Sequence, residues 1–146
     1  MRTTPVAERP LVLRARTAEE LMSVNPLSIR ADATVGEAGN FLVDRRISAA
    51  PVIDEAGHPV GVISQTDLMI HQRELMGTPP AADPSRADEL MTPAIFSVGP
   101  HTSAARVIEE MLRLKVHRLF VVDRAGVLIG VISALDVLRH LDTAVE

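Results

Sequence analysis

Hydrophobic residues recur with helical spacing in two long stretches of this chain. The first stretch places its apolar face at Val35, Ala38, Phe41 and Leu42. The second places its apolar face at Ala104, Val107, Ile108, Met111 and Leu112. Apolar positions three and four residues apart share one side of a helix, so each stretch predicts an amphipathic helix. Thr34 and Glu37 stand before the first face with the spacing of a capping box, which predicts the helix start.

Short apolar runs rich in β-branched residues surround these helices and predict strands. They come in pairs separated by a turn: residues 50–54 and 60–63, then residues 119–123 and 129–132. Each pair predicts a β-hairpin. Glycine adopts left-handed backbone conformations readily, and Asp side chains accept hydrogen bonds from turn N–H groups. We therefore expect purely structural roles in the turns for Gly57, Gly126, Asp54 and Asp123.

The two halves of this pattern are copies of each other. Residues 18–71 align with residues 87–140 without a gap, at a constant offset of 69 positions, and 15 of the 54 pairs are identical. The densest match joins Gly61–Asp67 to Gly130–Asp136. Two copies of this length are expected to pack on one another about a pseudo-twofold axis rather than to stack into an array. A site at their junction should then occur in two related versions.

Each copy reads as a short helix, strand, helix, strand, turn, strand and helix, an α+β organisation. The stretch between the copies contains Gly and Pro residues that block helix and strand alike, which indicates a linker. The predicted organisation is an N-terminal tail at 1–17, a repeat at 18–71, a linker at 72–86, a repeat at 87–141 and a C-terminal tail at 142–146.

Composition excludes several classes of function. The 146 residues are 47% hydrophobic, which suffices for one sizeable core. Only 2% are aromatic and the net charge is −4. Binding of single-stranded nucleic acid needs aromatic faces in a basic groove, and duplex binding needs a basic surface. Nucleic acid is therefore not an expected partner.

Cysteine is absent, so disulfides, thiolate chemistry and thiolate metal sites are excluded and a reducing compartment is permitted. Residues 1–17 lack the apolar run of a signal peptide, and no segment is long enough to span a bilayer. We expect a cytoplasmic protein without membrane insertion. His71 and His140 are related by the repeat, but the histidines show no ligand spacing within one element, so no metal site is predicted.

The sequence Ser-x-x-Asp follows the last strand of each copy, as Ser64 and Asp67 and again as Ser133 and Asp136. One interpretation is a capping box that satisfies free N–H groups at a helix start. The other is a ligand site, where a strand, a glycine and a helix start suit phosphate and the carboxylate accepts two hydrogen bonds from a ribose diol. Duplication favours the second only modestly, because a stabilising cap would be duplicated too.

Taken together, these motifs resemble a tandem pair of CBS domains, a Bateman module, over residues 18–141. The matching features are the lead-ins Glu20–Met22 and Glu89–Met91, the strand Ser48–Asp54, and Gly-x-x-Ser-x-x-Asp in both copies. The resemblance implies that each repeat forms a small sheet with two helices and that the repeats pair with pseudo-twofold symmetry. It also implies a homodimer, and clefts between repeats that bind AMP, ADP, ATP or S-adenosylmethionine. No cofactor is required.

The resemblance assigns roles residue by residue. Ser64 and Ser133 would approach phosphate, while Asp67 and Asp136 would hold the ribose hydroxyls. The second copy reads Lys115–Leu119, KVHRL, which is similar to the γ subunits of AMP-activated protein kinase. There the matching His and Arg face phosphates. This makes candidate phosphate ligands of two further residues, His117 and Arg118.

The first copy departs from that pattern, since Ser48 and Ala49 stand where the second has His and Arg. Its pocket is expected to be less basic. Arg46 is a candidate substitute, although a solvated helix end is the better explanation of an Arg there. In the family, adenine rests on the segment after the lead-in, here Val24–Leu27 and Pro93–Phe96, which core packing explains as well.

The leading hypothesis is a regulatory module that binds an adenosyl ligand and signals to an effector protein that the sequence does not identify. The alternative is a dimeric scaffold with vestigial pockets. Catalysis is not expected, because the chain has no activated nucleophile, no metal cluster and no base beside a serine.

Overall fold

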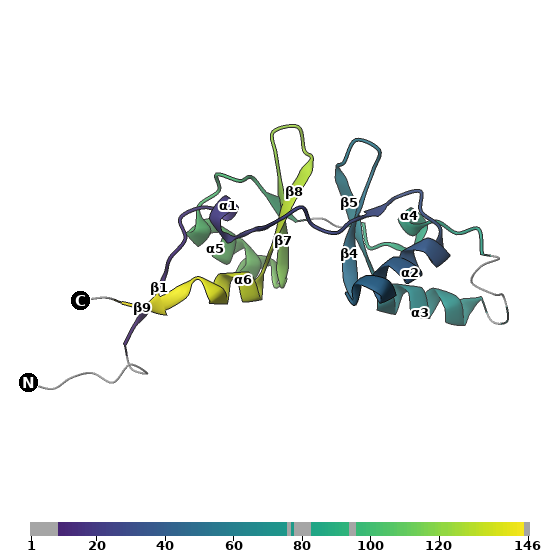
Figure 1. Cartoon of the computed structure of the whole chain (residues 1–146), viewed down its shortest axis with the longest axis horizontal. Coiled ribbons are helices and arrows are strands. Elements are labelled where there is room, and N and C mark those ends of the chain that lie inside the picture. Colours follow the sequence, from purple (N-terminus) through teal and green to yellow (C-terminus); the bar gives the residue numbers. More distant parts are fainter. Residues whose placement is uncertain (1–8, 76, 78–82, 94–95, 145–146) are drawn as a thin grey trace, which may run out of the picture. The chain divides into compact units, whose positions relative to one another are not determined.

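Two copies of one α+β order make up the chain (Figure 1). The computed structural model describes residues 9–75, 77, 83–93 and 96–144. The first copy contains α1 (Ala18–Leu21), β2 (Ser23–Val24), β3 (Ile29–Arg30), α2 (Val35–Arg45), β4 (Ala49–Ile53), β5 (Pro59–Ser64) and α3 (Gln65–Glu74). The second contains α4 (Ala87–Leu90), β6 (Ser97–Val98), α5 (Ala104–Leu114), β7 (Arg118–Val122), β8 (Leu128–Ser133) and α6 (Ala134–Arg139). The predicted fold class is confirmed.

The first long helix begins where the sequence predicts, and the second begins in the same way. The Thr34 hydroxyl accepts a hydrogen bond from the Glu37 N–H at 3.2 Å, so α2 starts behind a side-chain cap. Ser103 caps α5 in the same way, accepting from the Arg106 N–H at 3.1 Å. Within the described residues, no helix is both long and apolar enough to cross a bilayer.

The hairpin turns also follow the prediction. Gly57 and Gly126 have φ angles of 85° and 82°, in the left-handed region that side chains disfavour. One carboxylate oxygen of Asp54 accepts hydrogen bonds from the Ala56 and His58 N–H groups, at 3.0 and 2.9 Å. A glycine and an aspartate therefore fix the turn between β4 and β5.

The compact units of the structure do not coincide with the repeats of the sequence. The first unit combines the described residues up to Asn25 with 97–123 and those from Ile129 onward. The second unit combines 26–96 with 124–128. Each repeat therefore gives its lead-in to the other repeat's core: α1 and β2 from the first repeat, and α4 with Thr92 from the second. We call this the lead-in exchange.

In the first unit, the lead-in of the first repeat completes the sheet of the second. The strand order is β2-β8-β7-β6. β2 pairs antiparallel with β8, Ser23 opposite Val131 and Val24 opposite Gly130, while β6 pairs parallel with β7. α1 packs against α5 and adds Ala18 and Leu21 to the buried core. That core also contains Val107, Met111, Leu119, Val121 and Ile132.

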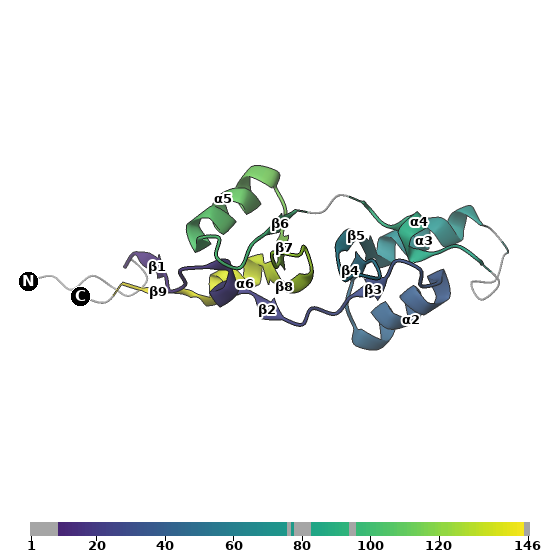
Figure 2. The same ribbon diagram turned by 90° about the horizontal axis from the view of Figure 1, so that it is seen from above.

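In the second unit the exchange runs the other way. The sheet order is β3-β4-β5, with β3 parallel to β4 and β4 antiparallel to β5. α4 lies beside α3 and β5 (Figure 2). Thr92, just after α4, exchanges two backbone hydrogen bonds with Val62 of β5, at 2.8 and 2.9 Å. The buried core contains Ile29, Ala38, Leu42, Ala50, Val52, Ile63 and Ala87.

The segments predicted as tails contain one more pair of strands. β1 (Leu11–Leu13) pairs antiparallel with β9 (Leu141–Thr143), and Figure 1 shows them side by side beyond α6. Sequence analysis does not predict this ribbon, because three residues are too few to show an alternating pattern. It belongs to the first unit.

The end of the predicted linker, from residue 83 onward, is anchored to the second unit. The buried Asp83 carboxylate accepts hydrogen bonds from the Ser85 N–H at 2.9 Å and from His71 Nε2 of α3 at 2.6 Å. The Ser85 backbone hydrogen bond is the largest influence on the pKa of Asp83, and with the Ser85 side chain and His71 it holds that pKa below its usual 3.8. This charge therefore stabilises the native linker.

We predict that alanine at Gly61 disrupts the lead-in exchange. A Cβ there would lie 2.6 Å from the Thr92 carbonyl oxygen and 2.5 Å from Met91 Sδ, and the backbone oxygen has little freedom to move. Overpacking of this kind costs about 1–3 kcal/mol of unfolding free energy. Denaturant unfolding of Gly61→Ala measures the loss.

Gly39→Ala is the matched control. Its Cβ would meet only the Leu68 Cδ1 methyl, at 3.7 Å, within helix α2. Alanine there should stabilise the protein by about 0.5–1 kcal/mol. Equal changes in the unfolding free energy of the two variants would contradict the role assigned to the close approach at Gly61.

We predict that the stabilisation from Asp83 depends on pH. Its pKa is lowered in the folded protein, so the stabilisation is complete above the usual value of 3.8 and disappears as the pH falls through the lowered value. The difference in unfolding free energy between wild type and Asp83→Asn should therefore be constant near neutral pH and shrink in acid. As a control, Asp32→Asn removes an exposed ion pair with Arg30 and should change the unfolding free energy by less than about 1 kcal/mol. A difference for Asp83→Asn that stays constant into acid would show that its charge is not the cause.

Candidate functional site

Both Ser-x-x-Asp motifs form complete capping boxes. The Ser64 hydroxyl accepts from the Asp67 N–H at 3.1 Å, and the Asp67 carboxylate accepts from the Ser64 N–H at 2.9 Å. Ser133 and Asp136 repeat this geometry at 3.1 and 2.8 Å. The capping interpretation is therefore realised in both units. It is compatible with ligand binding, because the box fixes the carboxylate in one orientation at the helix start.

The caps leave part of each carboxylate free to accept further hydrogen bonds. The Ser133 N–H bonds only Oδ2 of Asp136, and a carboxylate has about four acceptor positions on its two oxygens. The other oxygen, Oδ1, lies 3.7 Å from Nη1 of Arg139, and the Asp136 side chain is 12% exposed. Asp136 is thus a nearly buried, oriented acceptor with an arginine beside it.

The first unit brings the basic pair of the second repeat to the same place. The Ala134 N–H, at the start of α6, donates to the His117 carbonyl oxygen at 2.9 Å. Arg118 follows as the first residue of β7, and both side chains are exposed. Ser133, Asp136, His117 and Arg118 therefore gather where β7 begins and α6 starts. We call this the unit 1 site.

The lead-in exchange adds an apolar wall to the unit 1 site. β2 pairs with β8 at Gly130 and Val131, directly before Ser133. Val24 of β2 is 65% exposed, so its side chain is available for contact. Part of the predicted adenine segment therefore lies next to the predicted phosphate and ribose residues, although the two come from different repeats.

The second unit contains the related version, with different chemistry. The Gln65 N–H donates to the Ser48 carbonyl oxygen at 2.9 Å, so Ser48 takes the place of His117. Arg46 ends α2 in a left-handed conformation with φ 54° and is exposed. In the adenine segment Pro93 and Phe96 are exposed, while residues 94–95 lie outside the described part of the chain.

Charge separates the two versions most clearly. Asp67 lines a cavity of about 300 Å³ together with His71, Glu74 and Glu89, so three carboxylates face one imidazole. Such a lining repels phosphate. In the unit 1 site, Arg139 stands beside Asp136 at the position that Ile70 holds in the second unit. Sequence analysis missed Arg139 and Glu74, although their helical spacing from the aspartates was a usable signal.

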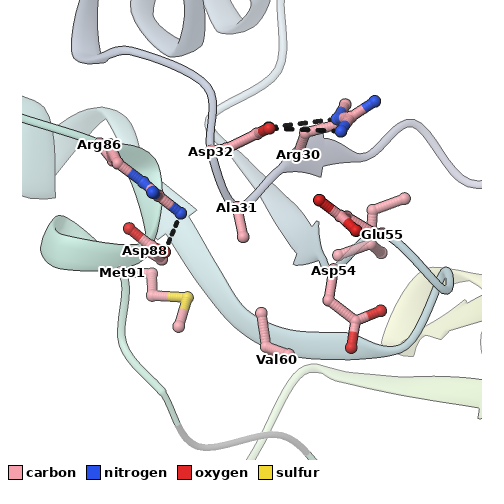
Figure 3. Close-up of a pocket in the computed structure, with 10 residues that line it drawn as sticks. Arg30, Ala31, Asp32, Asp54, Glu55, Val60, Arg86, Asp88 and Met91 are labelled. Carbon is pink, nitrogen blue, oxygen red and sulfur yellow. Dashed lines mark hydrogen bonds and ion pairs between the residues drawn. The ribbon is translucent and has the colours of Figure 1, made fainter.

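A larger hollow of about 380 Å³ lies in the second unit between the end of β3, the hairpin turn and α4 (Figure 3). Its two arginines are engaged by neighbouring carboxylates, Arg30 with Asp32 at 3.1 Å and Arg86 with Asp88 at 2.8 Å. None of the residues that the sequence assigns to ligand binding lines it. We therefore place the candidate site elsewhere. Over the described ranges, no three His, Asp or Glu side chains are grouped as metal ligands would be.

Comparison with known proteins places this geometry in a family. The family model of the CBS domain matches residues 18–74 and 87–143. The γ-3 subunit of 5'-AMP-activated protein kinase from Bos taurus is 37% identical over 112 residues, which cover 75% of this chain and 22% of that subunit. The chain thus spans less than a quarter of this relative.

Two solved structures share the fold. CBSX2, crystallised in complex with AMP, has a TM-score of 0.69 and 30% identity, covering 84% of this chain and 93% of that one. The cytosolic domain of the Mg²⁺ channel MgtE, crystallised with ATP, has a TM-score of 0.69 and 31% identity, covering 85% and 48%. With two family matches over most of its length and the predicted motifs in place, the chain belongs to the CBS domain family as a tandem CBS pair.

Proposed function

We propose that this CBS pair is a regulatory module that binds an adenosine derivative, AMP, ADP, ATP or S-adenosylmethionine, at the unit 1 site. The observation that carries the proposal is the convergence of Asp136, His117 and Arg118 at the start of α6. The bound AMP of CBSX2 and the bound ATP of the MgtE domain support this class of ligand. We propose no catalytic activity, since a binding site of this kind needs none.

Each part of the ligand meets a suitable group. The capping box aims the Asp136 carboxylate, which accepts hydrogen bonds from the two ribose hydroxyls. Arg118 supplies positive charge and N–H donors for phosphate, His117 supplies a further N–H donor, and the Ser133 hydroxyl lies at the start of the same helix. The exposed Val24 offers an apolar surface to the adenine ring.

We propose that the two pockets differ in affinity. Ser64 and Asp67 keep the ribose geometry in the second unit, with Ser48 and Arg46 as the remaining candidates. The carboxylates that line the cavity beside Asp67 oppose a phosphate. The second unit should therefore favour ligands with less negative charge.

Exposed apolar residues favour a dimer, which also keeps the scaffold alternative open. In the second unit Val43 and Met69 are 66% and 69% exposed, and their repeat partners in the first unit, Leu112 and Leu138, are 73% and 59% exposed. Large apolar side chains exposed at related positions are typical of an interface. We propose a cytoplasmic homodimer that passes ligand occupancy to an effector protein.

Titration calorimetry with AMP, ADP, ATP, ATP plus Mg²⁺ and S-adenosylmethionine tests the proposed ligand. We expect saturable binding of at least one of them to wild type. Asp136→Ala should weaken it about tenfold to a hundredfold, the worth of hydrogen bonds to a charged group. Asp67→Ala should have a smaller effect on phosphorylated ligands.

Two further variants sharpen the result. Arg118→Ala should weaken binding of AMP and ATP but leave adenosine nearly unchanged, because it removes only a phosphate contact. Asp32→Asn, outside both candidate sites, should bind like wild type. Flat titrations with all five ligand preparations would refute the nucleotide proposal and favour the scaffold.

Sedimentation equilibrium tests the proposed dimer. Leu112→Asp places a charge on the exposed apolar face of α5 and should raise the dimer dissociation constant at least about tenfold. Glu109→Gln, on the same helix and also exposed, is the control and should sediment like wild type. A wild-type monomer at all concentrations would refute both the dimer and the scaffold.

A further inference from the structure

The helices that carry the candidate ribose aspartates each have a histidine four residues further on, His71 in α3 and His140 after α6. The two histidines are related by the repeat, and the proposed function gives them no role. The structure shows what each of them touches. In both units, that contact joins the end of the site helix to the segment that leads into the exchanged helix.

In the first unit, His140 lies at a junction of backbone hydrogen bonds. Its Nδ1–H donates to the carbonyl oxygen of Asp136 at 2.8 Å. Its own carbonyl oxygen accepts from the Arg14 N–H at 2.7 Å. Arg14 follows β1 and precedes α1, so His140 ties the residue that would hold ribose to the incoming segment.

Glu20, in the first turn of α1, is a residue of the exchanged lead-in whose pKa is influenced by His140. The pKa of Glu20 is lowered mainly by the backbone N–H of Arg16, and the charge of His140 is among the smaller contributions in the same direction. Glu20 closes the capping box of α1 with Thr17.

In the second unit the same junction is built with side chains. His71 Nε2–H donates to the Asp83 carboxylate at 2.6 Å, and the two side chains are 19% and 3% exposed. Residue 83 aligns with residue 14 at the repeat offset of 69. The same position in the segment before each lead-in thus contacts the related histidine. In the first unit the contact is a backbone hydrogen bond, and in the second it is a buried side-chain pair.

The opposite end of each lead-in also reaches its site. β2 pairs with β8 just before Ser133, and Thr92 pairs with Val62 just before Ser64. Each lead-in and the segment before it are therefore held near both ends of the helix that carries the aspartate, by the strand pairing before its start and by the histidine contact near its end. A ligand that binds both the aspartate and the lead-in stabilises the whole arrangement, and linkage requires the effect to be reciprocal.

We propose that His71 and His140 are positioning residues that couple ligand binding at the aspartates to ordering of the lead-in segments. This coupling rests on the proposed function. The segments that would become ordered on ligand binding are residues 11–17 in the first unit, which continue toward the N-terminus, and residues 83–86 in the second. His140 acts through the backbone of Asp136, and His71 acts through the Asp83 carboxylate.

Hydrogen exchange of the full chain, with and without saturating AMP, tests the first unit. AMP affinity is measured by calorimetry on the same samples. We expect AMP to slow exchange of the amides in residues 11–17 several-fold in wild type. His140→Ala should remove most of this change. His140→Asn, whose side-chain amide can donate to the Asp136 carbonyl, should restore part of it.

The outcomes separate the two proposals. If AMP binds but exchange in residues 11–17 does not change, the coupling is refuted and the proposed function stands. If His140→Ala keeps the full change, lead-in ordering does not depend on this histidine and the assignment of His140 is wrong. If neither AMP nor any other adenosyl ligand binds, the proposed function and the coupling at the unit 1 site both fail.

A ligand-free experiment tests the second unit independently. His71→Ala, Asp83→Ala and the double variant form a double-mutant cycle, with exchange in residues 83–92 as the readout. Each single variant should speed exchange there, and the double variant should add little to either. Additive effects, or no effect beyond that of the exposed Asp32→Asn control, would overturn the role of the His71–Asp83 pair.

Discussion

The close approach of each lead-in to a glycine is the contact on which the rest of the fold depends. Met91 packs against Gly61, and Met22 packs against Gly130, where any Cβ would overlap the methionine side chain. Because these glycines lie three residues before the capping serines, the lead-in meets the strand that delivers the site. One contact that occurs twice thus brings each lead-in against the strand that runs into the capping serine.

The lead-in exchange explains how two repeats of similar sequence produce different sites. The backbone scaffold is shared, since both units have the same capping box and the same carbonyl contact at the helix start. The chemistry differs in side chains that the scaffold does not constrain. His117 and Arg118 stand where the first repeat has Ser48 and Ala49, and Asp67 shares a cavity with Glu74 and Glu89. We propose that this difference in side chains makes the two sites favour ligands with different phosphate content.

Local features were predictable because each has a local physical cause. Gly57 and Gly126 determine their turns through backbone conformation, and Thr34 and Ser133 determine helix starts through side-chain hydrogen bonds. The lead-in exchange was not predictable, because the repeat alignment is the same whichever core a lead-in joins. The three-residue strands β1 and β9 carry too little pattern. The ligand role of Ser133 and Asp136 also stays a proposal, since a cap and a ribose site use the same residues.

The lead-in exchange has a consequence for the origin of the chain. A single repeat on its own would lack the helix that completes its core, and its own lead-in would have no partner. An ancestral protein with one repeat would therefore have needed a second copy, each chain lending the other its first helix. Joining two copies in one chain would replace an association that depends on concentration with a covalent one, and would let the two copies differ in sequence.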